Sequence, residues 1–449
     1  MSLASPPPPR PPEGSVSLEM RRRAREMFDC ALAECSIQRA FTRNVRRDNG
    51  RLFIGDQCYE LGTHAELALV SIGKAGNTMA AALCDLVPTT VSGIVASTAK
   101  PPSPVGGLQY FCGGHPLPNE GSLRAGAAIL EFLHALPERA LVLFLISGGA
   151  SAVAEVPISP NLTLSDMVVT YRALVHSGAP IAEINAIRKH LSALKGGRMA
   201  QAAAAATQTS LLVSDVPDLA LDALASGPTM PDSSTVADCY SIAARYGILP
   251  HFPERVRAIF EGGHVHETPK AADPAFAKSS YVTVLSNQTA VQAANERAKA
   301  RGFTVEIDSG CDDWGYARAA DYLLNRLREL RRSASPVCLI SGGEVTVKVG
   351  ENSGVGGRNQ QFALYCAEKI AGEAITVLSA GTDGIDGNSP AAGALVDGST
   401  ESRARERALD TAGALARFDA FPLLESVGDA IVIGPTGNNV RDLRILLAY

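Results

Sequence analysis

Residues 67–86, LALVSIGKAGNTMAAALCDL, contain the pattern that decides the fold. A continuous apolar run leads into a glycine-bearing turn, and an alanine-rich segment of helical character follows the turn. The same order returns along the chain in residues 140–155, 281–302, 336–350, 375–387 and 430–447. Continuous apolar runs that alternate with helical segments are typical of parallel strands covered by helices on both faces. The pattern therefore predicts an α/β fold built on mostly parallel sheets.

The length of the chain indicates more than one such sheet. At 449 residues it exceeds what a single hydrophobic core normally organises. We expect two Rossmann-like domains of three layers each, with the strand-end turns on one edge of each sheet, where such folds bind ligands. The boundary is expected near residues 262–278, where Gly, Pro and Lys interrupt both periodicities. The predicted parts are a disordered proline-rich tail over residues 1–18, an N-terminal domain over 19–265 and a C-terminal domain over 270–449.

The composition excludes several classes of function. The net charge is −5, which provides no basic surface for nucleic acid or for an anionic membrane. No run approaches the roughly 20 apolar residues that span a bilayer, and the N-terminus has no secretory signal. The nine cysteines are scattered and form no CxxC pair, so we interpret them as reduced. We therefore expect a cytoplasmic protein that acts on a small molecule. Its oligomeric state stays open, with a homodimer as one candidate.

The turn SIGKAG, residues 71–76, is the first candidate site. A glycine turn at a helix start presents N–H groups and the positive end of the helix dipole to an anion. Lys74 adds a positive charge in this turn, and Gly73 lets the backbone approach a phosphate closely. The alternative is a solvated lysine on a tight turn. Its place at the end of an apolar run favours the phosphate-binding role.

Two similar turns, SGGAS at residues 147–151 and SGGE at residues 341–344, also follow strongly apolar runs. Paired glycines allow close approach to phosphate oxygens, and serine hydroxyls donate further hydrogen bonds, although a purely geometric turn would look the same. The chain has no Walker loop, and no GxGxxG fingerprint lies between a strand and a helix. The candidate nucleotide-binding residues of the two turns are Ser147, Gly148, Gly149, Ser151, Ser341, Gly342 and Gly343.

The segment GVGGRNQQ, residues 354–361, is the most specific of all. Three glycines within four residues lead to Arg358, where we predict that a helix begins. A cation at a helix start is disfavoured by the helix dipole, so a bound anion is the better explanation. We expect Gly357 to contact the nucleotide and Arg358 to bind phosphate oxygens as charge develops during transfer.

Carboxylates at two strand ends are candidate Mg²⁺ ligands. Asp215 follows the apolar run of residues 211–213, and Asp383 and Asp386 lie in the turn SAGTDGIDG, residues 379–387. Mg²⁺ usually takes only one or two protein carboxylates and keeps several waters. Asp383 is also a candidate base for a substrate hydroxyl, with a plain Asx turn as the alternative.

Cations gather near the end of a helix predicted over residues 184–198. Arg188 and Lys195 are candidates for holding a substrate carboxylate. Compensation of the helix dipole next to a glycine cap is an equally good explanation. His115, next to two prolines in GGHPLPNE, either contacts the substrate or holds its own loop.

Together these segments resemble the glycerate 2-kinase family, whose C-terminal half is called the MOFRL domain. The matching stretches, which lie within residues 69–397, are SIGKAG, GGHPLPNEGS, LISGGASA, INAIRKHLSALKGGRMA, LLVSDVPD, ASGPT, LISGGEVTV, GVGGRNQQFAL and SAGTDGIDGNSPAAGA. The resemblance implies two α/β domains with an interdomain active-site cleft. It further implies ATP-dependent phosphorylation of D-glycerate to 2-phosphoglycerate, with ATP and Mg²⁺ as cofactors. It also implies that Lys74 and Arg358 are the catalytic cations.

We therefore assign roles within a phosphoryl-transfer site. Transfer needs little covalent chemistry, so positioning and charge neutralisation carry the rate. The alternative is an NAD(P)H-dependent hydroxypyruvate reductase, a name that relatives of this family also carry, but the dinucleotide fingerprint is missing. The assigned residues are Lys74, Arg358 and Asp383 for catalysis, Arg188, Lys195 and Asn359 for glycerate, and Asp215 and Asp383 for the metal.

Overall fold

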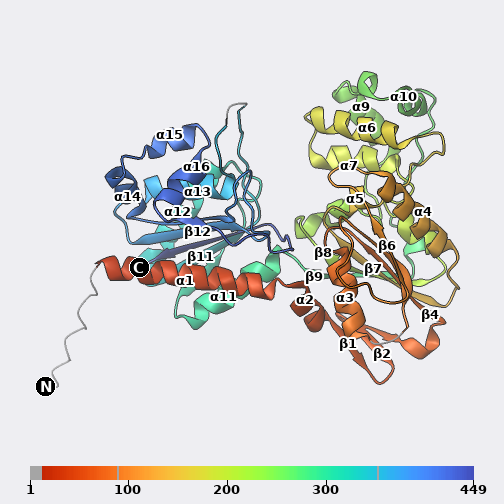
Figure 1. Cartoon of the computed structure of the whole chain (residues 1–449), viewed down its shortest axis with the longest axis horizontal. Coiled ribbons are helices and arrows are strands. Elements are labelled where there is room, and N and C mark those ends of the chain that lie inside the picture. The colour runs from red at the N-terminus through yellow and green to blue at the C-terminus, as the bar shows by residue number, and fades with distance from the viewer. Residues whose placement is uncertain (1–12, 88–89, 351–352) are drawn as a thin grey trace. The chain divides into compact units, whose positions relative to one another are not determined.

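The computed structural model describes residues 13–87, 90–350 and 353–449, which divide into two compact units (Figure 1). The first unit is Ile37–Ser286, and the second combines Asn287–Tyr449 with the N-terminal segment Met1–Ser36. The domain limits expected from the sequence are therefore displaced at both ends of the first unit. Residues 13–18, which we expected to be disordered, are helical. The rest of the expected tail lies outside the described residues, and the interdomain cleft stays a prediction.

A six-stranded parallel sheet forms the centre of the first unit. Its order is β6–β5–β4–β7–β8–β9, and every neighbouring pair runs parallel. The strands are β4 (Glu66–Ile72), β5 (Ser92–Ser97), β6 (Leu108–Cys112), β7 (Ala140–Ser147), β8 (Thr207–Val213) and β9 (Ser279–Leu285). The helices of this unit are α2 (Ile37–Asn44), α3 (Gly76–Leu86), α4 (Glu120–His134), α5 (Ala150–Val153), α6 (Leu164–His176), α7 (Ile181–His190), α8 (Arg198–Ala202), α9 (Val236–Arg245) and α10 (Glu254–Glu261).

The strand order of this sheet marks a place for a ligand. The chain proceeds from β4 through β5 to β6 on one side, and through β7 and β8 to β9 on the other. The order therefore reverses between β4 and β7. Open α/β sheets bind ligands at the carboxyl ends of the strands at such a switch point. The turn after β4 carries Lys74 and the turn after β7 is SGGAS, so two of the predicted turns lie together there.

Two additions extend the first unit. Helices α6, α7, α9 and α10 share their own apolar cluster, and Figure 1 shows them gathered beyond one end of the sheet. A small antiparallel sheet is made of β1 (Val45–Asp48), β2 (Arg51–Ile54) and β3 (Gln57–Glu60). The helix predicted over residues 184–198 is shorter than expected, because α7 ends at His190 and α8 begins at Arg198. Gly196 and Gly197 between them have φ angles of +58° and +83°, which interrupt a helix.

A mixed sheet forms the centre of the second unit. Among its described strands, in the order β10–β11–β15–β12–β13–β14, only the pair β10–β11 runs parallel. β10, β11, β12 and β14 still point the same way, because β15 and β13 run against them. The expected parallel arrangement thus holds fully in the six-stranded sheet of the first unit and only for these four strands in the second. The strands are β10 (Thr304–Ile307), β11 (Val337–Gly342), β12 (Ile375–Gly381), β13 (Gly393–Asp397), β14 (Ala430–Ile431) and β15 (Asp442–Ala448).

Helices cover both faces of the second sheet (Figure 1). α1 and α11 pack on one face, and α12 and α13 pack on the other. Met27 and Phe28 of α1 are completely buried, and Arg21 donates to Asp397 at 3.2 Å and to Asp429 at 2.7 Å. The first helix of the chain is therefore part of the C-terminal core. The helices are α1 (Glu13–Glu34), α11 (Asn287–Ala300), α12 (Tyr316–Ser333), α13 (Arg358–Lys369), α14 (Thr400–Glu406), α15 (Thr411–Ala416) and α16 (Ala420–Ser426).

The strand β15 corrects one prediction. The repeated pattern predicted a helix after the glycine turn of residues 434–437, but residues 442–448 form a strand between β11 and β12. Every residue of β15 is buried. A short, fully buried stretch does not reveal its type by periodicity, which explains the error. In the part of the chain that the structure describes, no helix is long and apolar enough to cross a membrane.

Candidate active site

The turn after β4 is held by the protein itself. All four N–H groups of residues 73–76 donate inside the first unit: Gly73 to Ala96 O, Lys74 to Gly148 O, Ala75 to Ser147 Oγ and Gly76 to Gly73 O. Gly73 has a φ of +120°, and a β-carbon there would lie 2.3 Å from Ser147 Oγ. Gly73 and Ser147 therefore shape the turn, and their predicted contact with a nucleotide is not supported. The backbone of this turn offers no N–H for a phosphate.

The turn after β7 has the donors that the first turn lacks. Gly149 has a φ of +80° and is the N-cap of α5. The first N–H groups of a helix have no acceptor within it. Across the described residues, the N–H groups of Gly149, Ala150 and Ser151 donate to no other group of the chain. Three adjacent unused donors at a switch point form a site for an anion such as a phosphate.

Charged side chains surround this second turn. A β-carbon on Gly149 would lie 2.9 Å from the His115 ring and 3.1 Å from Lys74 Cγ, and one on Gly148 would lie 2.0 Å from Asp215 Oδ2. Lys74 is exposed and forms no ion pair within the described residues. Burial and then the charge of Lys74 lower the pKa of His115 below its usual value. The predicted residues Lys74, Gly148, Gly149 and Asp215 are thus brought together, and His115 joins them.

Glu155, shortly after the end of α5, is the centre of a buried polar cluster. Lys195, which is 2% exposed, forms an ion pair with Glu155. Tyr171 Oη and Ser192 Oγ also donate to Glu155, at 2.5 Å and 2.6 Å. Burial lowers the pKa of Lys195 although Glu155 opposes this shift. The assignment of Lys195 to substrate binding is therefore corrected, because its ammonium group is enclosed and already paired.

Arg188 differs from Lys195. Its guanidinium lies 4.8 Å from the centre of the Tyr171 ring, but it forms no hydrogen bond or ion pair with any described residue. Its Nε is buried without a partner, and burial lowers the pKa of Arg188. A half-buried guanidinium without a hydrogen-bonded partner is a good receptor for a carboxylate. This position supports the role predicted for Arg188.

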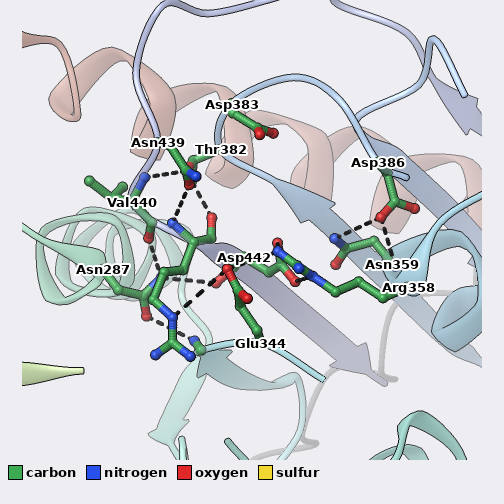
Figure 2. Close-up of polar contacts among 12 residues, drawn as sticks. Asn287, Glu344, Arg358, Asn359, Thr382, Asp383, Asp386, Asn439, Val440 and Asp442 are labelled. Carbon is green, nitrogen blue, oxygen red and sulfur yellow. Dashed lines mark hydrogen bonds and ion pairs between the residues drawn. The ribbon is translucent and has the colours of Figure 1, made fainter. Parts of the chain in front are cut away.

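In the second unit, Arg358 lies at the start of α13 as predicted, but two carboxylates already neutralise it. Its Nε and Nη2 donate to Asp442 at 2.6 Å and 3.0 Å, and Nη2 lies 2.8 Å from Glu344 Oε1 (Figure 2). Burial disfavours the charged guanidinium, but Asp442 outweighs this effect and the pKa of Arg358 rises. Of the three guanidinium nitrogens, only Nη1 has no partner among the residues that the structure describes, so only Nη1 is left for a ligand.

The anion expected at the start of α13 is a carboxylate of the protein. Asp386, which is 3% exposed, accepts from the backbone N–H groups of Asn359 and Gln360 at 3.1 Å and 2.9 Å. Both side-chain amides also donate to it (Figure 2 shows Asn359). Burial raises the pKa of Asp386 to about 6, even though four N–H donors favour the charged form. Asn359 is buried, and its oxygen accepts from Ser379, so the predicted substrate contact is corrected.

Gly357 is needed for the packing of its own loop against the loop of Asp386. A β-carbon there would lie 2.3 Å from Asp386, so the residue at this point must be glycine for the two loops to approach. Gly357 lines the cavity described below. Its close packing against Asp386 explains why this residue is glycine, so its predicted contact with a nucleotide is not needed to explain it.

The backbone N–H groups of the turn after β11 also have partners within the protein. The N–H groups of Gly342, Gly343 and Glu344 donate to Ser309 Oγ, Asn287 Oδ1 and Asp312 Oδ1, at 2.9, 3.0 and 2.8 Å. Arg444, which is completely buried, binds the carbonyl oxygens of Gly342 and Gly343 from below. Ser341 is fully buried. The predicted nucleotide contacts of Ser341, Gly342 and Gly343 are therefore corrected, because side chains of the protein take the place of the phosphate.

A cavity of about 560 Å³ opens beside Arg358. Its lining comes entirely from the second unit and includes Glu344, Arg358, Asp383 and Asp386. Asp383 is half-buried and burial raises its pKa. No group of three or more His, Cys, Asp or Glu side chains in the described residues is arranged to hold a metal ion. Asp383 and the Asp215 of the first unit are each single carboxylates, which suits Mg²⁺ only if a ligand supplies further oxygens.

The sequence missed the partners of Arg358. Asp442 was not identified as a partner, because the strand that begins with it was predicted as a helix. Glu344 directly follows the SGG turn that we assigned to phosphate, and its acidity was the available signal against that assignment. The remaining predicted residues lie in separate units, with Lys74, Arg188 and Asp215 in the first and Arg358 and Asp383 in the second.

The fold and the site define a class: an α/β protein with a turn of unused N–H donors at the switch point of a parallel sheet. Residues 23–261 match a family described as a domain of unknown function, DUF4147, and residues 337–442 match the MOFRL family. The chain is 37% identical to the D-glycerate 2-kinase of Thermotoga maritima, over 84% of this chain and 89% of that protein. It is 36% identical to an Agrobacterium vitis protein named "Putative hydroxypyruvate reductase", over 95% of this chain and 94% of that protein.

A solved structure agrees with this match. The crystal structure of a glycerate kinase from T. maritima has a TM-score of 0.83 and 32% identity, covering 96% of this chain and 100% of that one. The chain belongs to the glycerate 2-kinase family.

Proposed function

We propose that this protein transfers the γ-phosphoryl group of ATP to the 2-hydroxyl of D-glycerate. The observation that carries the proposal is the turn after β7, with three unused N–H donors and the cation Lys74 beside them. Such a group of donors neutralises phosphate oxygens without covalent chemistry. Membership in the glycerate 2-kinase family supplies the substrate and the position of transfer.

In this proposal each residue of the first unit has one task. The N–H groups of residues 149–151 bind phosphate oxygens, and the Lys74 ammonium balances charge that moves during transfer. Arg188 binds the glycerate carboxylate, which provides the partner that its guanidinium lacks. Asp215 would hold Mg²⁺, which shields the phosphate charges when it is bound.

The second unit contributes Arg358 and Asp383. Arg358 can bind a ligand only through Nη1, because Asp442 and Glu344 already pair with its Nε and Nη2. These two carboxylates partly neutralise the positive charge that a ligand meets there. Asp383 has a raised pKa, which suits it to accept the proton of the substrate hydroxyl.

The hydroxypyruvate reductase reading has one observation in its favour, which is the strand order of the first sheet. That order also occurs in dinucleotide-binding domains. In those domains the first strand-to-helix turn binds the pyrophosphate through its N–H groups, whereas here the N–H groups of residues 73–76 are all occupied. The kinase is therefore the better explanation.

The test measures ADP formed from ATP and D-glycerate, beside NADH and NADPH consumption with hydroxypyruvate. We expect ADP formation that depends on D-glycerate and Mg²⁺. Coupling the product to enolase without phosphoglycerate mutase distinguishes the 2-phosphate, which enolase dehydrates directly, from the 3-phosphate. Reduced nicotinamide consumption without ADP would overturn the proposal.

A further inference from the structure

Arg188 and Arg358 are held in the protein in two different ways. Asp442 and Glu344 pair with Arg358 and leave one nitrogen of its guanidinium for a ligand. Arg188 lies over the ring of Tyr171 instead, at 4.8 Å from the ring centre, and it forms no hydrogen bond with any described residue. Stacking on an aromatic ring attracts a guanidinium without using its N–H groups. The donors of Arg188 therefore stay available to a carboxylate.

The Tyr171 ring is held in one position by Glu155. Tyr171, in α6, is 3% exposed, and its hydroxyl donates to Glu155 Oε2 at 2.5 Å. Burial and then the charge of Glu155 raise the pKa of Tyr171 well above its usual value, so the phenol keeps its proton and remains a donor. A buried ring whose hydroxyl is bonded has little freedom to move. Arg188 thus stacks on a rigid surface.

Glu155 acts on Arg188 through its charge and not through a hydrogen bond. Its two oxygens accept from four donors, which are Ser192 Oγ, the Val156 N–H, Tyr171 Oη and Lys195 Nζ. These donors occupy the lone-pair sites that a carboxylate offers. Burial lowers the pKa of Arg188, and the Glu155 charge acts against this shift. Glu155 therefore stabilises the charged guanidinium and leaves its N–H groups free.

Glu155 also belongs to the segment that carries the turn after β7. It lies shortly after Ser151, the last of the three unused donors, and its own N–H donates to Ser122 O at 3.1 Å. Glu155 and Tyr171 thus connect this turn to Arg188, and all of these residues are in the first unit. A shift of the Tyr171 ring would move Arg188 relative to the turn.

From this arrangement we propose that Tyr171 is a positioning residue for the substrate carboxylate and acts through Arg188. Its ring holds the guanidinium in place and leaves the planar fork of N–H groups for the carboxylate. The inference rests on the proposed function for the role of Arg188, and it adds the residue that orients this side chain.

The test compares Tyr171→Met with Tyr240→Met. Tyr240, in α9, packs in the same helical cluster and donates its hydroxyl to Phe260 O at 3.1 Å. Among the described residues no cation stacks on its ring, so it is a matched control. The Kd for D-glycerate is measured by calorimetry, and KM values for D-glycerate and ATP are measured in the kinase assay.

We expect a loss that is specific to D-glycerate. Tyr171→Met should raise both its Kd and its KM by at least about tenfold, with KM for ATP within about twofold of the control. Tyr171→Phe keeps the ring and should stay within about threefold of the wild type.

A double variant separates positioning from a general effect on the fold. If Tyr171 acts through Arg188, Tyr171→Met has no further effect once Arg188 is replaced by methionine. The Kd of the double variant should then lie within about twofold of that of Arg188→Met alone, whereas a merely structural role would add the two effects. Thermal unfolding is recorded for every variant, and Tyr171→Leu takes the place of Tyr171→Met if the latter does not fold.

Separate outcomes overturn the inference and the proposed function. If Arg188→Met weakens D-glycerate binding but Tyr171→Met behaves like Tyr240→Met, Tyr171 does not position Arg188. Additive effects in the double variant, or a rise in KM for ATP in place of D-glycerate, overturn the inference as well. An unchanged Kd in Arg188→Met, or no binding of D-glycerate by the wild type, removes both the role of Arg188 and the inference. If the variants change D-glycerate binding as expected but the wild type forms no ADP, the inference stands and the proposed function falls.

Discussion

Lys195 forms a buried ion pair with Glu155, although the sequence alone suggested that it binds a ligand. Lys195→Met leaves the Glu155 carboxylate inside the protein without its cation. Breaking a buried pair in this way costs about 3–5 kcal/mol, so urea unfolding of the first unit should occur at clearly lower concentration. The double variant Lys195→Met with Glu155→Leu should recover part of that loss. A stable Lys195→Met protein with a raised KM for glycerate would instead return Lys195 to the substrate.

His115 reports on the charge of Lys74. Its pKa is lowered from 6.5 by burial first and by Lys74 second, so Lys74→Met should raise it only part of the way back. NMR titration measures this, with His115→Gln to assign the signal. Because native His115 binds fewer protons than unfolded His115, its contribution to stability falls as the pH drops through 6.5. An unchanged pKa in Lys74→Met would mean that the two side chains are not neighbours in solution.

The two predicted catalytic cations should respond differently to removal. Lys74 is exposed and unpaired within the described residues, so Lys74→Met should keep the unfolding free energy and lower kcat by roughly 10²–10³. Arg358→Met also leaves Asp442, which is 1% exposed, without its cation, so it should lower both stability and activity. Parallel measurements of kcat and urea unfolding separate the two cases. Equal stability of the two variants would contradict the pairing seen for Arg358.

At the level of elements, local sequence predicted the turns but not their use. LFLISGGAS and CLISGGEVT are almost the same, and both are strand-end turns as predicted. The N–H groups of the second turn are taken by Asn287, Ser309 and Asp312, which come from other segments. Those of the first turn are unused. Which distant side chains reach a turn depends on tertiary packing, so no local pattern could separate an anion site from a filled turn.

The turn after β7 can be tested with a matched pair of glycines. Gly149 and Gly178 have φ angles of +80° and +76°, so alanine strains both backbones by about 1 kcal/mol. A β-carbon on Gly178 meets nothing within 4 Å, whereas one on Gly149 presses on His115 and Lys74. Gly149→Ala should therefore raise the Kd for tripolyphosphate and the KM for ATP by about tenfold or more, and Gly178→Ala should change neither. Equal effects of the two substitutions would remove the turn from phosphate binding.

At the level of the whole molecule, the sequence predicted two α/β sheets but misplaced their limits. The glycine turns and apolar runs are local signals, and they correctly indicated a sheet in each half. The membership of α1 depends on contacts with strands more than 300 positions later in the chain. An amphipathic helix at the N-terminus gives no sign of which sheet it will cover, so proximity in sequence suggested the wrong one.

The position of α1 predicts how the second unit folds. Residues 287–449 alone should lack the cover that Met27 and Phe28 give to the sheet, and should be partly unfolded with exposed apolar surface. Joining residues 13–36 behind Tyr449 through a flexible linker restores α1 to the strand β15, against which it packs. This permuted unit should unfold cooperatively in urea, and Phe28→Ala within it should cost about 3–5 kcal/mol because the side chain is fully buried. Phe421→Ala, a half-buried phenylalanine of the same unit, serves as the control and should cost less. Cooperative unfolding of residues 287–449 without the helix would show that α1 is an accessory of this unit and not part of its core.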